Sequence, residues 1–249
     1  MTRIVVLPTA RAAGDALARF VARALTTSPN LVLGLPTGRT PLLFYDAIAR
    51  LHEQGRADFR RATTFNLDEF AGLAATDPRS FHAFMKQHLF DRVNLSPVRR
   101  HVLNGSARSW QKEIVSFERK LADAGGLDFA ILGIGANGHV AFNEPGPSLV
   151  ARTHRARLSD TTRRANAWAF DGRWRDVPRY ALTLGMGSIL GARGVLLLAT
   201  GEHKAGIVAR AFAGPITTRV PASLLQAHPN VVIVLDRDAA AKLPVSLRR

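Results

Sequence analysis

The residues best suited to chemistry lie in a glycine-rich segment, Leu132–Gly146, which reads LGIGANGHVAFNEPG. This segment follows an apolar run that is typical of a buried strand, and it places His139 and Glu144 just beyond the strand's end. An imidazole near a carboxylate can take up and release protons close to neutral pH. Open α/β sheets bind ligands at this end of their strands, so the segment predicts a catalytic loop. A purely structural pair of His and Glu is the alternative interpretation.

A second candidate acid–base group ends another apolar run, in Phe65–Phe70 (FNLDEF). Asp68 and Glu69 are adjacent, so in an extended chain they point to opposite faces and only one of them can face a crevice. A carboxylate in that position can move a proton between neighbouring carbon atoms of a bound sugar. The alternative is a strand-end aspartate that caps the next turn.

A candidate anion site lies in Leu33–Pro41 (LGLPTGRTP), which joins a predicted strand to a predicted helix. Thr37, Gly38 and Thr40 would present backbone N–H groups and hydroxyls at a helix N-terminus, a geometry that suits a phosphate. An ordinary turn between strand and helix is the alternative, and the Gly-Lys-Ser/Thr of a Walker loop is absent. Lys204, at the start of another predicted helix, can reach a phosphate as a point charge.

Two other kinds of site are disfavoured by the sequence. Gly133, Gly135 and Gly138 match the spacing of a dinucleotide fingerprint, but the residues that follow lack the pattern of the long helix which that fingerprint requires. We therefore interpret these glycines as positions where backbone amides contact a small ligand. The chain has no cysteine, and its eight histidines lack metal-ligand spacing, so we expect no disulfide and no metal site.

The elements that position these groups follow a regular alternation. Short apolar runs predict strands at 4–7, 31–35, 63–67, 127–134, 194–199 and 231–235. Helical spacing predicts helices at 13–25, 42–51, 80–90, 106–121, 202–212 and 222–227, with Thr40 and Ser80 as N-caps. Strands that are apolar on both faces and separated by helices favour an α/β fold. We predict a single-domain, open, mostly parallel sheet with helices on both faces, a Rossmann-like three-layer arrangement. The polar, Arg-rich segment 151–179 is a candidate lid.

Composition limits the setting of this fold. The 249 residues are 47% hydrophobic and 21% charged, which is ordinary for a globular protein. No apolar run is long enough to span a membrane and the N-terminus does not resemble a signal peptide, so we expect a cytoplasmic protein with no membrane partner. The net charge of +15 comes from scattered arginines without interleaved aromatic residues. We interpret it as a solvated surface that can attract an anionic substrate, and we expect no nucleic-acid partner.

Taken together, these segments resemble the glucosamine-6-phosphate deaminase family, in the broader group that includes 6-phosphogluconolactonases. The blocks NLDEF and ANGH are far more specific together than either is alone. The matching segments occur in the family's order and cover most of the chain: Leu33–Pro41, Phe65–Leu73, Ser80–Leu95, Asn104–Ala107, Leu132–Gly146, Val177–Leu190 and Gly201–Pro229.

The resemblance implies a role for each candidate residue. Asp68 matches the base that moves a proton between C2 and C1, and His139 matches the residue that assists pyranose ring opening. Asn137 and Glu144 match the network that supports His139. The phosphate-binding positions are Thr37, Gly38, Arg39, Thr40 and Lys204. The implied reaction converts glucosamine 6-phosphate and water to fructose 6-phosphate and ammonia without a cofactor. The implied partner is this small amino sugar phosphate, with the protein either a monomer or a homo-oligomer.

The chain departs from the family pattern at one important position. Trp168 stands where the family usually has an arginine that contacts phosphate, so that contact is missing unless Arg163, Arg164 or Arg173 compensates. Loss of that arginine also motivates a rival substrate, galactosamine 6-phosphate. Two other rivals are a 6-phosphogluconolactonase, which would not need the proton shuttle of Asp68, and a non-catalytic sugar-phosphate sensor.

Overall fold

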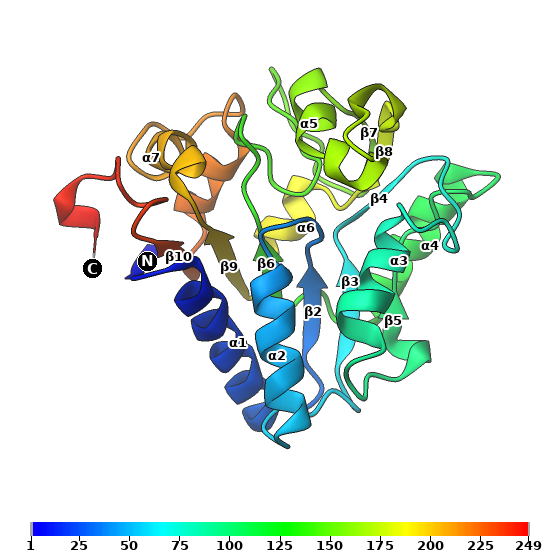
Figure 1. The fold of residues 1–249 in the computed structure, drawn as a ribbon. Helices are drawn as coiled ribbons and strands as arrows, with labels where there is room; N and C mark the ends of the chain where they lie inside the picture. Colours follow the sequence, from blue (N-terminus) through cyan, green and yellow to red (C-terminus); the bar gives the residue numbers. More distant parts are fainter. Residues whose placement is uncertain (1, 249) are drawn as a thin grey trace.

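A seven-stranded sheet forms the centre of the computed structural model, which describes residues 2–248 (Figure 1). The strand order is β1-β10-β9-β6-β2-β3-β5, and every pairing in it is parallel. This arrangement confirms the predicted open parallel sheet. The strands are β1 (Thr2–Leu7), β2 (Val32–Leu35), β3 (Thr63–Asn66), β5 (Arg100–His101), β6 (Phe129–Leu132), β9 (Gly194–Ala199) and β10 (Val231–Asp236).

Helices cover both faces of this sheet because its strands are apolar on both faces. Along β9, Leu196 and Leu198 pack with one group of helices, while Leu197 packs on the opposite face. The first group is α1 (Ala10–Thr27), α2 (Leu42–Glu53) and α3 (Phe81–Met85) with its π-helical continuation Lys86–Phe90. The second group is α4 (Trp110–Asp123), α6 (Met186–Leu190) and α7 (Ala205–Phe212).

The order of the strands creates a switch point between β2 and β6. From β2 the chain continues outward to β3 and β5, whereas from β6 it continues in the other direction to β9 and β10. Loops that leave the carboxyl ends of β2 and β6 therefore diverge and leave a crevice between them. The predicted anion loop follows β2, and the predicted catalytic loop follows β6.

A second, antiparallel sheet was not predicted. It contains β4 (Asp68–Phe70), β8 (Tyr180–Thr183) and β7 (His154–Arg157), and in Figure 1 it lies beyond the carboxyl end of β3. Phe70, Phe142 and Phe170 form the centre of an aromatic cluster beneath it. The candidate lid at 151–179 is thus partly a built element, because it supplies β7 and the helix α5 (Asp160–Ala165).

Several predicted helix ends differ in the structure. Thr40 does not cap α2, because Pro41 occupies the N-cap position without a side-chain hydrogen bond. Ser80 does cap α3, through a hydrogen bond of 3.0 Å from Ala83 N–H. The helix expected from residue 106 begins at Trp110, and the helix expected at 222–227 is a 3₁₀ helix over Pro221–Ala227. The remaining 3₁₀ turns are Pro97–Arg99, Ala167–Phe170, Trp174–Asp176, Glu202–Lys204 and Val245–Leu247.

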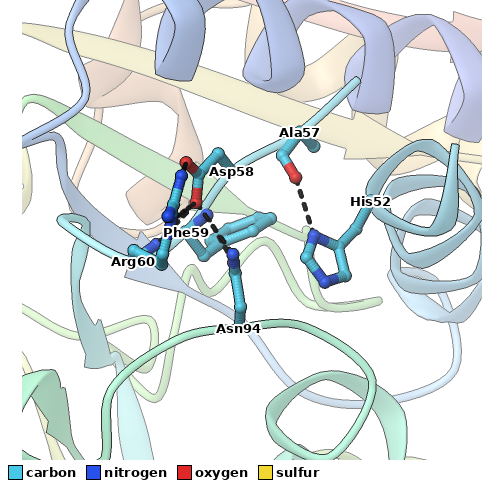
Figure 2. Close-up of polar contacts among 6 residues, drawn as sticks. All are labelled: His52, Ala57, Asp58, Phe59, Arg60 and Asn94. Carbon is cyan, nitrogen blue, oxygen red and sulfur yellow. Dashed lines mark hydrogen bonds and ion pairs between the residues drawn. The ribbon is translucent and has the colours of Figure 1, made fainter. Parts of the chain in front are cut away.

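The connection from α2 to β3 is fastened at its base by side chains (Figure 2). Asn94 donates to the carboxylate of Asp58 at 2.9 Å and accepts from Phe59 N–H at 2.8 Å. Arg60 forms a two-point ion pair with Asp58 and holds the pKa of that carboxyl well below its usual range. His52 Nδ1 donates to the carbonyl of Ala57 at 2.7 Å. These contacts fix the start of the strand whose other end leads to Asp68.

Candidate active site

A cavity of about 370 Å³ opens at the switch point of the large sheet. Its walls come from the loops that follow β2, β3, β6 and β9, and from the 3₁₀ turn after α5. Asp68 and His139 both line it, although they are far apart in the sequence. The other sequence-predicted residues that line it are Thr37, Gly38, Arg39, Thr40, Gly133, Gly135 and Lys204, whereas Asn137 and Glu144 lie behind His139.

One end of the cavity has the features of an anion site. Gly38 has a φ of 100°, a left-handed conformation that turns the loop after β2. Within residues 2–248, the backbone N–H groups of Gly38, Arg39 and Thr40 have no protein acceptor. Lys204 donates from Nζ to the carbonyl of Ile134 at 2.7 Å, and burial together with the charge of Arg39 lowers its pKa. Unpaired N–H groups beside two cations form an environment that favours a phosphate.

Asp68 is a buried carboxyl that lines the same cavity. Its strand β4 pairs with β8 opposite Thr183, and its side chain is only 6% exposed. Burial raises the pKa of Asp68 to about 8, the charge of Glu69 adds to this rise, and a hydrogen bond from Thr37 opposes it. The Oδ1 atom has no hydrogen-bond partner among the described residues. Asp68 thus lines the cavity and retains a carboxyl oxygen that no protein donor satisfies.

Glu69 points away from Asp68, as the alternation of an extended chain predicts. Its carboxylate accepts hydrogen bonds from the backbone N–H groups of Phe70, Phe81 and His82, at 2.7, 3.0 and 2.9 Å. Burial raises the pKa of Glu69 to about 7, and these three donors oppose the rise. Glu69 therefore anchors the start of α3 and does not reach the cavity.

His139 is oriented by a chain of hydrogen bonds. The NH₂ group of Asn137 donates to Glu144 Oε2 at 2.7 Å, which leaves Asn137 Oδ1 as the acceptor for His139 Nδ1, also at 2.7 Å. The neutral ring consequently carries its proton on Nδ1 and has an unprotonated Nε2. Burial lowers the pKa of His139 to about 4, nearby Lys204 contributes to the decrease, and Glu144 opposes it. A neutral imidazole of this kind can accept a proton from a ligand at pH 7.

Gly135 makes room for the imidazole of His139. A Cβ atom at position 135 would lie 2.2 Å from Cε1 and 2.3 Å from Nδ1 of the ring, well inside van der Waals contact. The ring thus packs directly against the backbone of residue 135, which is possible only because glycine has no side chain. This steric role was not predicted, since the sequence analysis assigned Gly135 to ligand contact.

The same network connects the site to the Arg-rich segment 151–179. Ser159, the N-cap of α5, donates from its backbone N–H and its hydroxyl to Glu144, at 3.2 and 3.1 Å. Thr162 of α5 places its hydroxyl 3.2 Å from His139 Nδ1. Neither residue was predicted, because their only sequence signal is the Ser-x-x-Thr start of a short helix. Any displacement of α5 would disturb the imidazole.

The three arginines that could have compensated for Trp168 are engaged elsewhere in the structure. Arg163 is buried and donates to the carbonyls of Val177 and Arg175. Arg164 stacks on the ring of Trp174 at 4.0 Å, and Arg173 pairs with Asp171 and Asp176. None of the three lines the cavity.

Trp168 itself lies in the cavity wall. It is 39% exposed and packs edge-on against Phe84 at 6.3 Å. Its indole contributes apolar surface and one N–H donor where a guanidinium is absent. The positive charge in the wall of the cavity therefore comes from Arg39 and Lys204.

Other kinds of site receive no support in the part of the chain that the structure describes. No group of three or more His, Asp or Glu side chains there could hold a metal ion. No helix there is long and apolar enough to cross a membrane. The residues that follow Gly138 form a turn with a short bridge between Val140 and Asn143, and not the long helix of a dinucleotide-binding turn.

Comparisons with known proteins define the family. Residues 8–234 match the family described as "Glucosamine-6-phosphate isomerases/6-phosphogluconolactonase", and the chain belongs to this family. It is 43% identical to the glucosamine-6-phosphate deaminase of Halothermothrix orenii over 226 residues, which are 91% of this chain and 93% of the relative. The enzyme of the same name from Thermoanaerobacter pseudethanolicus is 41% identical over 91% of this chain and 89% of its own length.

Solved structures agree with this assignment. A monomeric glucosamine-6-phosphate deaminase superposes with a TM-score of 0.93 at 38% identity, covering 96% of this chain and 99% of that one. The 6-phosphogluconolactonase of Trypanosoma brucei superposes with a TM-score of 0.75 at 21% identity, over 98% of this chain and 99% of that one, and so shares the fold. The predicted fold class and family resemblance are both confirmed.

Proposed function

We propose that this chain is a glucosamine-6-phosphate deaminase, which converts glucosamine 6-phosphate and water to fructose 6-phosphate and ammonia. The observation that carries the proposal is the convergence of Asp68 and His139 on one cavity that also presents Arg39, Lys204 and free backbone N–H groups. Proton transfer and anion binding within one cavity are the two requirements of the reaction. The identity to named deaminases over most of the chain supports the same activity.

The first step opens the sugar ring. Neutral His139, with its Nε2 unprotonated, takes the proton from the hydroxyl at C1 and delivers a proton to the ring oxygen as the bond from C1 to that oxygen breaks. The product is an open-chain aldehyde. Asn137 and Glu144 hold the imidazole in the required tautomer through their hydrogen bonds, so they act as positioning residues.

The second step moves a proton from C2 to C1. Ionised Asp68 removes the proton from C2, and the electron pair forms an enolamine as the ammonium group at C2 gives up one proton and the carbonyl oxygen at C1 takes one up. Return of the proton to C1 gives a ketimine at C2, and water then adds to that carbon as ammonia leaves. Asp68 must be ionised to begin this step, and the protonated amino group of the substrate would lower the pKa of the adjacent carboxyl on binding.

The phosphate end fixes the register of the open chain. A phosphate held by the loop Thr37–Thr40 and by Lys204 would place the reacting carbons toward Asp68 and His139. Holding a flexible open-chain sugar in one geometry is a large part of the catalysis that such a site can supply. Segment 151–179, which contributes Ala165, Asn166 and Trp168 to the wall, would close over the ligand as a lid.

Comparison of three substrates tests the proposal. Ammonia and fructose 6-phosphate would be measured with glucosamine 6-phosphate, and in parallel with galactosamine 6-phosphate and 6-phosphogluconolactone. We expect the highest kcat/KM with glucosamine 6-phosphate. A preference for the galactose epimer would assign the rival substrate that Trp168 motivates, and binding of all three without turnover would indicate a sensor.

The Asp68→Asn variant tests the assigned base. Loss of general base catalysis is expected to lower kcat by about 10²–10⁴-fold, with sugar-phosphate affinity within a few-fold of the original. Asparagine keeps the volume of the side chain, so a folding defect is not expected to explain the loss. Near-normal ammonia release by this variant would contradict the role of Asp68.

A further inference from the structure

His203 lines the phosphate end of the cavity, and the reaction above gives it no role. It lies in the 3₁₀ turn Glu202–Lys204 that follows β9, one residue before Lys204. Its ring is exposed, so it belongs to the mouth of the cavity and not to the core. The imidazole of His203 is exposed and lies near two cations in a candidate anion site, so it is available to bind a ligand.

The position of the His203 ring is set by its own turn. Gly201 lies against it, because a Cβ at position 201 would be 2.9 Å from His203 Nδ1. The N–H of Gly201 donates to both carboxylate oxygens of Asp236 at 3.0 Å, which fastens the turn to the end of β10. Neither ring nitrogen of His203 has a hydrogen-bond partner within residues 2–248. The turn therefore fixes the position of the ring, and both ring nitrogens remain available for a hydrogen bond with a ligand.

The charged groups around His203 come from three elements. Lys204 is on the same turn, Arg39 is on the loop after β2, and Asp236 is at the end of β10. Burial, then Lys204 and Arg39, lower the pKa of His203, while Asp236 raises it. Asp236 is already the acceptor for two backbone N–H groups, those of Gly201 and Ala239. Two neighbouring cations thus oppose a third positive charge as long as no anion lies between them.

We propose that His203 is a third side-chain ligand of the substrate phosphate and that it binds the phosphate in its protonated form. The inference rests on the proposed function only in taking the bound anion to be the phosphate of the substrate. A dianion placed among Arg39, Lys204 and His203 would reverse the local field and favour the imidazolium. Binding would then take up a proton, and affinity would rise as the pH falls.

Sulfate is a suitable probe because it stays a dianion throughout the range to be measured. Its Kd would be determined by calorimetry between pH 5.5 and 7.5, where Asp68 remains largely protonated and His139 remains largely neutral. We expect sulfate affinity to fall by about tenfold across this range, the effect of one charge-assisted hydrogen bond at the lower end of its scale. Repeating the titration in buffers of different ionisation enthalpy would measure the proton taken up.

Three variants separate His203 from other groups. His203→Gln is expected to bind sulfate weakly at every pH and to lose both the slope and the proton uptake. His203→Arg, which carries a permanent charge, is expected to bind tightly without a slope. His52→Gln changes a histidine remote from the cavity and keeps a donor for Ala57, so it should behave like the original protein.

Two results would overturn the inference: an unchanged slope in His203→Gln, or a protein whose sulfate affinity does not depend on pH. Turnover of glucosamine 6-phosphate by the same preparations distinguishes this failure from failure of the proposed function. If the protein turns over glucosamine 6-phosphate but its sulfate affinity does not depend on pH, only the role of His203 is contradicted. If sulfate affinity depends on pH but there is no turnover, the anion site is supported and the deaminase activity is contradicted.

Discussion

Burial acts on the two central residues of the site in opposite directions. It raises the pKa of Asp68 to about 8 and lowers that of His139 to about 4, so each group is largely uncharged at pH 7 before a ligand arrives. In the proposed reaction, a neutral His139 is already in the form needed to open the ring. Asp68 would become a base when a cationic amino group enters, which would connect its activation to the substrate.

The contact between Gly135 and the His139 ring leads to a prediction at this scale. Gly135→Ala would place a methyl group within 2.4 Å of three ring atoms, so the imidazole must leave its position. We expect kcat to fall by about 10²–10³-fold, since misplacement by about 1 Å has effects of this order. Steady-state ammonia release would measure the loss.

The matched control is Gly206→Ala, in α7, where a Cβ would meet nothing within 4 Å. This change is expected to leave kcat unaltered and to stabilise the helix slightly, because alanine has the higher helix propensity. Sulfate affinity should stay within a few-fold of the original in both variants. Equal kcat values for Gly135→Ala and the original protein would show that the ring tolerates displacement.

Residue types and spacing were enough to predict which residues meet at the cavity, but not how they are held. The alternation of an extended chain predicted that Asp68 and Glu69 diverge, and they do. The hydrogen bonds of Glu69 to Phe81 and His82, and those of Glu144 to Ser159, join residues whose proximity depends on the folded chain. No local sequence pattern predicts which distant residues come into contact, so the hydrogen bonds that support His139 are seen only in the folded structure.

At the scale of elements, α3 depends on a carboxylate that belongs to β4. Glu69→Ala would leave the buried N–H groups of Phe70, Phe81 and His82 without their acceptor. We expect the free energy of unfolding to fall by about 2–4 kcal/mol, the cost of several unsatisfied donors. Urea denaturation monitored by circular dichroism would measure it.

Ser80→Ala provides the comparison, since it removes one capping bond of the same helix. Its expected cost is about 1 kcal/mol. If Glu69→Ala destabilised the protein no more than Ser80→Ala does, water would be replacing the carboxylate and Glu69 would not be the anchor of α3. Because Phe81 also lines the cavity, a loosened α3 should raise KM in Glu69→Ala.

The elements that the sequence predicted well are those with a strong pattern of their own. Buried strands such as β9, which is apolar at every position, and long amphipathic helices such as α1 have such a pattern. The strand β7 reads His-Arg-Ala-Arg, and only its pairing with β8 makes it a strand. The segment 151–179 around β7 was therefore predicted only as a candidate lid, whereas in the structure it also contains a strand and a helix that pack with other elements.

For the whole molecule, the buried carboxyls predict how stability depends on pH. Asp68 keeps its proton in the folded state up to about pH 8 but loses it near pH 4 when unfolded, so the folded state binds more protons in between. The free energy of unfolding therefore loses this contribution as the pH rises from about 4 to about 8. Glu69 acts with the same sign, between its usual pKa and about 7.

Asp68→Asn isolates this effect, because asparagine does not titrate. We expect the variant to gain stability relative to the original protein as the pH rises from 5 to 9, by at least about 1 kcal/mol. Urea denaturation at the two pH values would measure the difference, and subtraction removes the contributions of the histidines and of Glu69. If the difference in the free energy of unfolding between variant and original protein did not change with pH, folding would not raise the pKa of Asp68.

The strand order has a further consequence for the time at which activity can appear during synthesis. The strands β2 and β6 lie side by side, and Asp128 accepts from Val32 N–H at 2.8 Å across 96 positions of the chain. A nascent polypeptide that has emerged only as far as α4 already contains Asp68 and the loop after β2. It still lacks His139, Lys204 and the strand β6, which lies between the two halves of the sheet. Such a growing chain cannot yet form the complete cavity, because β6 and β9, whose loops supply part of its wall, are still to be made.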